Sequence, residues 1–261
     1  MERTVSELRK EPHWSYSAFN TYLTCPLKFR FQYIDGIPPE RTGSCFAFGR
    51  AIHAALSEYA RRCVTLKEVE DIFEELFKAE INATDNLVYK PKETYDSLLN
   101  TGFGILKAAL NSWDNSCTIR SVAESFSVEV PGLSKPLIGE FDMVVKDTDG
   151  DCIVDWKTSA AKWPSGKADR DLQATVFSYA YCRKYGRIPS FRFDVITKTK
   201  TPSMEVHHTR RSAGDFVRMA FLMNRIEDAV RKGVFIPHDT GFSCADCAYS
   251  RRCKNWHRQG V

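Results

Sequence analysis

The stretch GEFDMVVKDTDGDCIVDWK, at positions 139–157, decides the fold that we expect for this chain. It contains two apolar runs that are separated by the polar segment 147–151, which has the composition of a turn. This pattern predicts two strands joined as a hairpin. A hairpin of this length places Asp142 and Asp155 at the same end of adjacent strands.

Lys157 adds a positive charge to this pair of acids. It lies two positions after Asp155, and alternate side chains of a strand point to the same face. Phosphodiester hydrolysis uses carboxylate ligands for a hard divalent metal and a positive charge near the phosphate. The two acids and the lysine therefore predict a site for that chemistry. The alternative is that each acid is a solvated turn residue at the end of a strand.

The bulk composition is that of a globular protein. The chain has 261 residues, 43% of them hydrophobic and 27% charged, and can bury one large core or two small ones. It has no apolar run long enough to span a bilayer, and its first residues lack the apolar core of a signal peptide, so we expect a cytoplasmic protein without a membrane partner. The net charge of +4 permits nucleic-acid binding without requiring it.

Hydrophobic periodicity predicts the order of the elements. Helices are expected from Ser17, as N-cap, to the break at Pro26, and at 47–56, 65–77, 93–113, 171–181 and 213–232. Strands are expected at 122–130, around Asp142, around Asp155 and at 191–197.

This order predicts an α/β fold with a mixed sheet core flanked by helices. We expect a single module, 1–261, with four parts. They are N-terminal helices at 15–56, a helical subdomain at 57–118, the core at 119–200, and a C-terminal helix with a cysteine-rich segment at 201–261.

The cysteine-rich tail is the most specific feature of the sequence. Cys244, Cys247 and Cys253 have the spacing C-x2-C-x5-C, and Trp256 follows them. Three closely spaced thiolates are one ligand short of a closed metal site. The alternative is that they are three unconnected cysteines.

Taken together, these motifs resemble the PD-(D/E)XK nuclease superfamily, specifically its RecB-like branch, over roughly residues 16–256. The family pattern is a helix with His, a strand with Asp, a strand with Asp/Glu-x-Lys, and a helix that begins with Gln. The matching residues are His53, Asp142, Asp155, Lys157 and Gln173. The resemblance implies a restriction-endonuclease-like core in which the histidine and both acids hold Mg²⁺ or Mn²⁺. It also implies that the lysine stabilises charge or orients water, and that the glutamine positions the lysine or the substrate.

Two positions depart from the family pattern. Phe141 stands where the superfamily's name has proline. The family's Gln-x-x-x-Tyr motif has Phe177 in place of its tyrosine, and Tyr179 follows two places later.

The resemblance also supplies a fourth cysteine. Iron–sulfur members of this branch, including the CRISPR-associated adaptation nucleases and the AddB-type nuclease domains, have one cysteine near the start of the module and three near its end. Cys25, followed by Pro26, matches the first position. A 4Fe-4S cluster is therefore implied as a structural staple between the two ends, and Zn²⁺ on the same sulfurs is the alternative. Its ligands would be Cys25, Cys244, Cys247 and Cys253.

The function expected from this resemblance is a metal-dependent DNA exonuclease. The helical subdomain would narrow the approach to the metals and so favour single-stranded ends. Protein partners would belong to a repair, recombination or CRISPR adaptation complex. The alternative is a DNA-binding or assembly subunit with a vestigial nuclease site and a structural Fe-S or Zn centre. The intact set of His, Asp, Asp and Lys argues against it, since buried charges are costly to retain.

Overall fold

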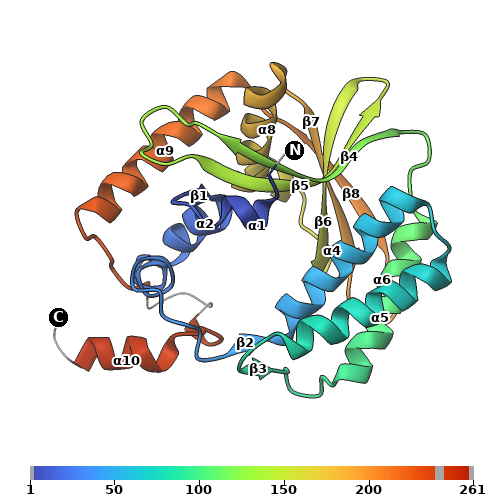
Figure 1. The fold of residues 1–261 in the computed structure, drawn as a ribbon, viewed down its shortest axis with the longest axis horizontal. Coiled ribbons are helices and arrows are strands. Elements are labelled where there is room, and N and C mark those ends of the chain that lie inside the picture. The colour runs from blue at the N-terminus through green and yellow to red at the C-terminus, as the bar shows by residue number, and fades with distance from the viewer. Residues whose placement is uncertain (1–2, 239–243, 259–261) are drawn as a thin grey trace.

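A six-stranded mixed sheet forms the centre of the chain (Figure 1). The structure is a computed structural model that describes residues 3–238 and 244–258. The sheet has the order β1-β5-β6-β7-β8, and β4 also pairs with β5. Its strands are β1 (Trp14–Ser15), β4 (Thr118–Val128), β5 (Leu137–Asp147), β6 (Gly150–Ser159), β7 (Ser190–Thr197) and β8 (Met204–Arg210). β6 and β7 run parallel, and β5 and β6 form the antiparallel hairpin that the sequence predicts.

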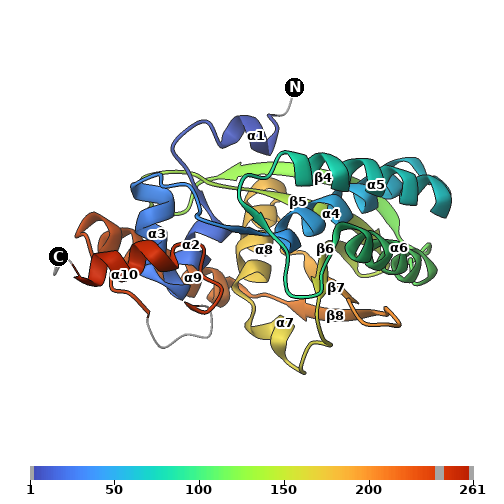
Figure 2. The same cartoon turned by 90° about the horizontal axis from the view of Figure 1, so that it is seen from below.

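Helices lie on both faces of this sheet, which confirms the mixed α/β fold (Figures 1 and 2). They are α1 (Val5–Leu8), α2 (Tyr16–Thr24), α3 (Pro26–Phe29), the π-helix Arg30–Ile34, α4 (Ser44–Arg62), α5 (Leu66–Asn82), α6 (Tyr95–Asn111), α7 (Lys167–Arg170), α8 (Leu172–Tyr185), α9 (Ala213–Arg231) and α10 (Ser250–Arg258). Two short strands, β2 (Thr42–Gly43) and β3 (Leu87–Val88), pair apart from the main sheet. Within the described ranges, no helix combines the length and apolar character needed to cross a bilayer.

Each face of the sheet has its own core. Buried side chains of α4, α5 and α6 pack against one face around Trp156, and those of α2, α8 and α9 pack against the other around Phe193. The two sets alternate along the strands, because successive strand residues point to opposite faces. Ile153 accordingly belongs to the α8 side and Val154 to the α4 side.

Two helix starts test the sequence-based caps. Thr65 and Glu68 form the expected capping box at α5. The expected N-cap Ser17 is wrong, because Ser15 caps α2 by accepting a hydrogen bond from the Ala18 amide at 3.2 Å. Ser15 also ends β1, so the chain passes from strand to helix without an intervening loop.

β8 is the longest of the strands that sequence reasoning missed, and the two-residue strands β1, β2 and β3 are the others. The segment 201–210 was expected to belong to the C-terminal helical part, yet Met204–Arg210 pairs antiparallel with β7. β8 pairs with one neighbour only, and four of its seven residues are charged or His. Edge strands of this kind lack the apolar alternation from which strands are recognised.

Asp151, at the start of β6, is a buried carboxylate with three partners. Arg120 Nε lies 2.7 Å from its Oδ1, the Tyr181 hydroxyl donates to its Oδ2 at 2.7 Å, and Arg187 also pairs with it. Burial alone would raise the pKa of Asp151, but the hydroxyl and the two guanidinium groups outweigh burial and lower it. The ionised form therefore stabilises the fold.

We expect Asp151→Asn to lower the free energy of unfolding at pH 7 by about 1–3 kcal/mol, because it removes the charge that three donors share. The folded-state pKa lies below the unfolded value, so the wild-type advantage is complete above about pH 4 and shrinks as the pH falls through the folded-state pKa. Urea unfolding of both proteins from pH 7 downward measures this. Asp149→Asn, at an exposed pair with Arg210, is the matched control and should change stability by less than about 0.5 kcal/mol.

Candidate active site

The site lies where β5 changes partners. On one side, β5 pairs with β1 through Leu137 and Ile138, and then with β6 from Met143 onward. Residues 139–142 therefore have no strand partner on that side. A gap in the ladder leaves backbone and side chains open to a ligand, and Asp142 stands at its end.

Asp142 is held by one backbone and one side-chain donor. The Trp156 amide donates to its Oδ2 at 2.9 Å, and His53 Nδ1 lies 3.2 Å from the same oxygen. Burial alone would raise the pKa of Asp142, but His53 and Lys157 outweigh burial and lower it. Asp142 also raises the pKa of the His53 imidazole, because its charge and hydrogen bond outweigh burial, which alone would lower that pKa.

Asp155 and Lys157 form a second pair directly behind Asp142. Lys157 Nζ lies 2.6 Å from Asp155 Oδ2, and the carboxylate is only 2% exposed. Burial raises the pKa of Asp155 to about 6 even though Lys157 opposes it. Asp155 Oδ2 is buried, and the Lys157 ammonium is the group that compensates its charge.

Gln173 joins the acid to the lysine. Its Nε2 donates to Asp155 Oδ1 at 2.6 Å, and its Oε1 accepts from Lys157 Nζ at 2.7 Å. The side chain is buried in the first turn of α8, where Asp171 caps the helix by accepting from the Gln173 amide at 2.8 Å. The five residues singled out from the sequence are thus brought into two adjoining groups, His53 with Asp142 and Asp155 with Lys157 and Gln173, and the Trp156 amide that binds Asp142 lies between Asp155 and Lys157 in the chain.

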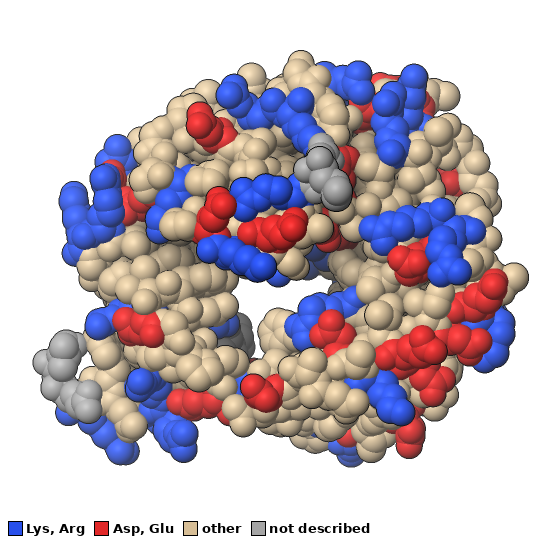
Figure 3. All heavy atoms as spheres, in the orientation of Figure 1, with Lys and Arg blue, Asp and Glu red and all other residues tan. Residues whose placement is uncertain are grey.

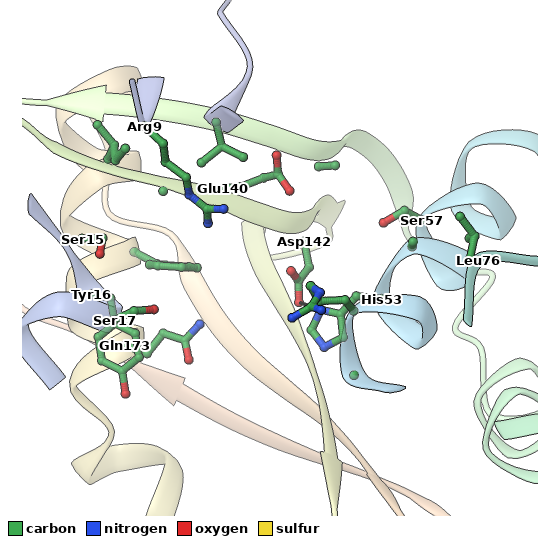
Figure 4. Close-up of a pocket in the computed structure, with 18 of the residues that line it drawn as sticks. Arg9, Ser15, Tyr16, Ser17, His53, Ser57, Leu76, Glu140, Asp142 and Gln173 are labelled. Atoms are coloured by element: carbon green, nitrogen blue, oxygen red, sulfur yellow. Dashed lines mark ion pairs between the residues drawn. The ribbon is translucent and has the colours of Figure 1, made fainter. Parts of the chain in front are cut away.

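A cavity of about 1080 Å³ opens in front of this chain (Figure 4). His53, Asp142 and Gln173 line it, while Asp155 and Lys157 lie behind them. Arg9 and Glu140 line the same cavity (Figure 4). Its charged lining comprises four arginines, Arg9, Arg50, Arg61 and Arg62, and four acids, Glu58, Glu75, Glu140 and Asp142. The arginines suit contacts with a phosphate backbone.

β5 is twisted at Asp142, a feature that the sequence does not reveal. The β4–β5 ladder places Ala123 across from Asp142, and Ala123 has a φ of +51°, which non-glycine residues rarely adopt. Phe141 packs on the α8 side and Met143 on the α4 side, although alternate residues of a regular strand share a face. The twist lets Asp142 reach His53 on α4 while its neighbours remain in the core, and alanine carries no turn signal that could have predicted it.

The two tyrosine positions also differ from expectation. Tyr179 points away from the site and donates to the Glu129 carbonyl at 2.8 Å, so it does not replace the tyrosine of the family motif. Phe177 lines the cavity instead, on the same helical face as Gln173. Tyr16 of α2 lines the cavity as well, and sequence reasoning did not assign it a role there. Burial and the charges of Asp171 and Asp155 raise its pKa, which keeps the phenol neutral.

The cysteine-rich tail docks on the segment that leads into α4. The Glu40 amide donates to the Ala248 carbonyl at 2.9 Å, and the Tyr249 hydroxyl donates to the Ile37 carbonyl at 3.0 Å. The Glu40 carboxylate accepts from the first backbone amides of α10, those of Arg251 and Arg252. Residues 37–40 and 248–252 are therefore held together by direct contacts.

The four predicted cluster cysteines lie around this junction. Cys25, Cys247 and Cys253 pack against one small apolar cluster, and Cys244 donates to the His238 carbonyl at 3.2 Å. The cluster consists of Leu27, Phe31 and Tyr249. Backbone amides lie 3.5 Å from the sulfurs of Cys25 and Cys247, the kind of contact that suits thiolates.

No group of three or more His, Cys, Asp or Glu side chains in 3–238 and 244–258 is arranged to hold a metal ion. The acidic pair nevertheless fits a hard divalent cation in its chemistry, since it offers two carboxylates beside an imidazole. The observation that favours such a cation is the repulsion between the two carboxylates, since the charge of Asp142 helps to raise the pKa of Asp155.

Comparisons with known proteins concern the fold and the family. The chain is similar over 94% of its length to the crystal structure of a candidate exonuclease from Eubacterium rectale, with a TM-score of 0.62, 14% sequence identity and 93% of that chain covered. It also matches the crystal structure of SSO0001 at a TM-score of 0.40 and 12% identity, over 78% of this chain and 92% of that one. No curated protein matches the sequence. The family model of the PD-(D/E)XK nuclease superfamily matches residues 13–254, and the chain therefore belongs to that superfamily.

Proposed function

We propose that this protein is a metal-dependent DNA exonuclease of the RecB-like branch that acts on single-stranded ends. The observation that carries the proposal is the set of contacts among the buried Asp155, Lys157 and Gln173, beside the half-buried Asp142 at a cavity that four arginines line. Buried charges cost stability, and groups of this kind cluster at functional sites.

Asp142, Asp155 and His53 would hold Mg²⁺ or Mn²⁺, which supplies an activated water and neutralises charge on the phosphate. Lys157 stabilises the negative charge that develops on the phosphate oxygens or holds the attacking water. Gln173 fixes the lysine, because its Oε1 and the carboxylate of Asp155 leave the ammonium little freedom. Asp142 is oriented by the Trp156 amide and His53.

The shape of the molecule supports a substrate that enters by its end. Figure 3 shows an opening near the centre of one face, and the ribbon in the same orientation has the sheet, the helices α4–α6 and the docked tail around it. The cavity with His53 and Asp142 adjoins α4. A single strand threads through such an opening, whereas a closed circle has no end to insert.

We also propose that a 4Fe-4S cluster, or Zn²⁺ as the less favoured occupant, joins Cys25 to the three cysteines of the tail. The apolar cluster shared by three of these cysteines supports the proposal. Its role would be structural, since it lies at the junction of the two chain ends and none of its cysteines lines the catalytic cavity.

The test is cleavage of single-stranded DNA labelled at the 5′ or the 3′ end, in Mg²⁺, in Mn²⁺ and in EDTA. We expect linear strands to be shortened from one end, covalently closed circles of the same sequence to survive much longer, and EDTA to stop the reaction. Equal cleavage rates on linear and circular DNA would show that the protein is an endonuclease. Cleavage of RNA in preference to DNA would contradict the substrate proposed here.

A further inference from the structure

Gly49, in the interior of α4, has a property that no other glycine in 3–238 and 244–258 shares. Its φ is not in the left-handed region, and no atom lies within 4 Å of the position that a Cβ would occupy. Gly102 and Gly139, in contrast, leave room for aromatic rings, which approach that position to 2.1 and 2.4 Å. Glycine weakens a helix interior relative to alanine. Neither backbone geometry nor packing within the protein accounts for Gly49.

The open space beside Gly49 belongs to the catalytic cavity. Gly49 lines that cavity together with His53, which follows four residues later and therefore lies one turn further along the same helical face. Because Gly49 has no side chain, the space along α4 stays open as far as the His53 imidazole, which contacts Asp142. Glycine is used where a ligand passes close to the backbone.

Phe46 lies on α4 about one turn before Gly49, outside the set of residues that line the cavity. It is three residues before Gly49 and seven before His53, so all three share one face of α4. Its side chain is 62% exposed, which is unusual for a phenylalanine. The rise of an α-helix separates Phe46 from His53 by about 10.5 Å along the axis, a distance that a strand crosses within a few nucleotides.

We propose that α4 carries a nucleotide subsite, in which the strand backbone passes over Gly49 and a nearby base stacks on Phe46. This inference rests on the proposed function and names how its substrate is held. Any base presents a flat face, so the contact would hold single strands of any sequence. A base paired within a duplex is not free to stack on this ring, so the subsite selects unpaired nucleotides.

The first test places a side chain in the open space beside Gly49. Leucine favours helix, so we expect Gly49→Leu to keep or raise the unfolding temperature while it weakens binding of a fluorescein-labelled oligothymidine at least about tenfold. Binding is measured by anisotropy with Ca²⁺ in place of Mg²⁺, and Mn²⁺ affinity by calorimetry should stay unchanged. Gly214→Leu in α9, outside the cavity, is the control and should leave DNA binding as in wild type. Unchanged DNA binding in Gly49→Leu overturns the inference, and so does a parallel loss of Mn²⁺ affinity, which would assign the effect to His53.

The second test concerns the base. Phe46→Ala should weaken binding by about tenfold, and Phe46→Trp should preserve it. An abasic site moved along the oligonucleotide should weaken wild-type binding at one position and have no further effect there in Phe46→Ala. An abasic penalty that persists in Phe46→Ala overturns the stacking contact. If the wild type cleaves no nucleic acid, the proposed function fails, but these binding experiments still decide whether the subsite exists.

Discussion

Lys157→Ala is expected to slow strand cleavage by about 10²- to 10³-fold or more while Mn²⁺ still binds. The Lys157 ammonium is not a metal ligand. It is the positive charge nearest to Asp155 and is fixed there by Gln173. A preorganised charge of this kind acts on the transition state much more than on the bound substrate, so kcat falls and KM changes little. Single-turnover cleavage together with Mn²⁺ calorimetry measures both effects.

Three further variants show whether the effect of Lys157→Ala is specific to this lysine. Lys162→Ala removes an exposed lysine that pairs with Glu205, and should cleave like wild type. Asp142→Ala and Asp155→Ala should lose Mn²⁺ affinity as well as cleavage, because they remove proposed ligands. Cleavage by Lys157→Ala at a rate near that of wild type would contradict the role proposed for the lysine.

Cys25→Ser is expected to remove colour and stability together. Wild-type protein isolated without air should be brown, and both Cys25→Ser and Cys247→Ser should bleach it to the same extent. Cys25 and Cys244 are 219 positions apart, and in the chain-entropy model a bridge that closes so long a loop contributes about 5 kcal/mol. Lower solubility and a lower unfolding temperature should therefore accompany the loss of colour.

The control for this experiment is Cys45→Ser, which changes an exposed cysteine of α4 and should leave colour and stability unchanged. Visible absorbance, iron and zinc analysis and thermal unfolding give the readouts. A colourless wild type with one zinc per chain would remove the iron–sulfur cluster and keep the staple. A brown and stable Cys25→Ser protein would disprove the pairing of the two ends.

Local sequence patterns predicted much of the core. The apolar runs on either side of Asp142 and Asp155 predicted the hairpin, because its strands are buried and its turn is rich in Asp and Gly. The capping box at Thr65 was equally local, since all of its contacts lie within four residues. Features of this kind need no knowledge of the rest of the chain.

The remaining features depend on contacts that no local pattern encodes. Ala123 adopts its unusual backbone because β4 must follow the twist of β5, and alanine gives no sign of it. β8 is stabilised by one neighbour, and its polar residues hide it. The open space beside Gly49 depends on which residues surround it in the folded protein, so the sequence does not show it. Tertiary context, not propensity, decides all three.

The docking of the tail on the segment before α4 has a consequence for biosynthesis. Leu27 and Phe31 share their apolar cluster with Tyr249, and Glu40 caps α10, so residues made early are completed by residues made about 200 positions later. At translation rates of about 5–20 residues per second, roughly 10–45 s separate the synthesis of Phe31 from that of Tyr249. During this time the nascent chain exposes an unfinished apolar surface. The apolar cluster can be completed only after α10 has left the ribosome, which makes this helix and Tyr249 a late checkpoint in folding.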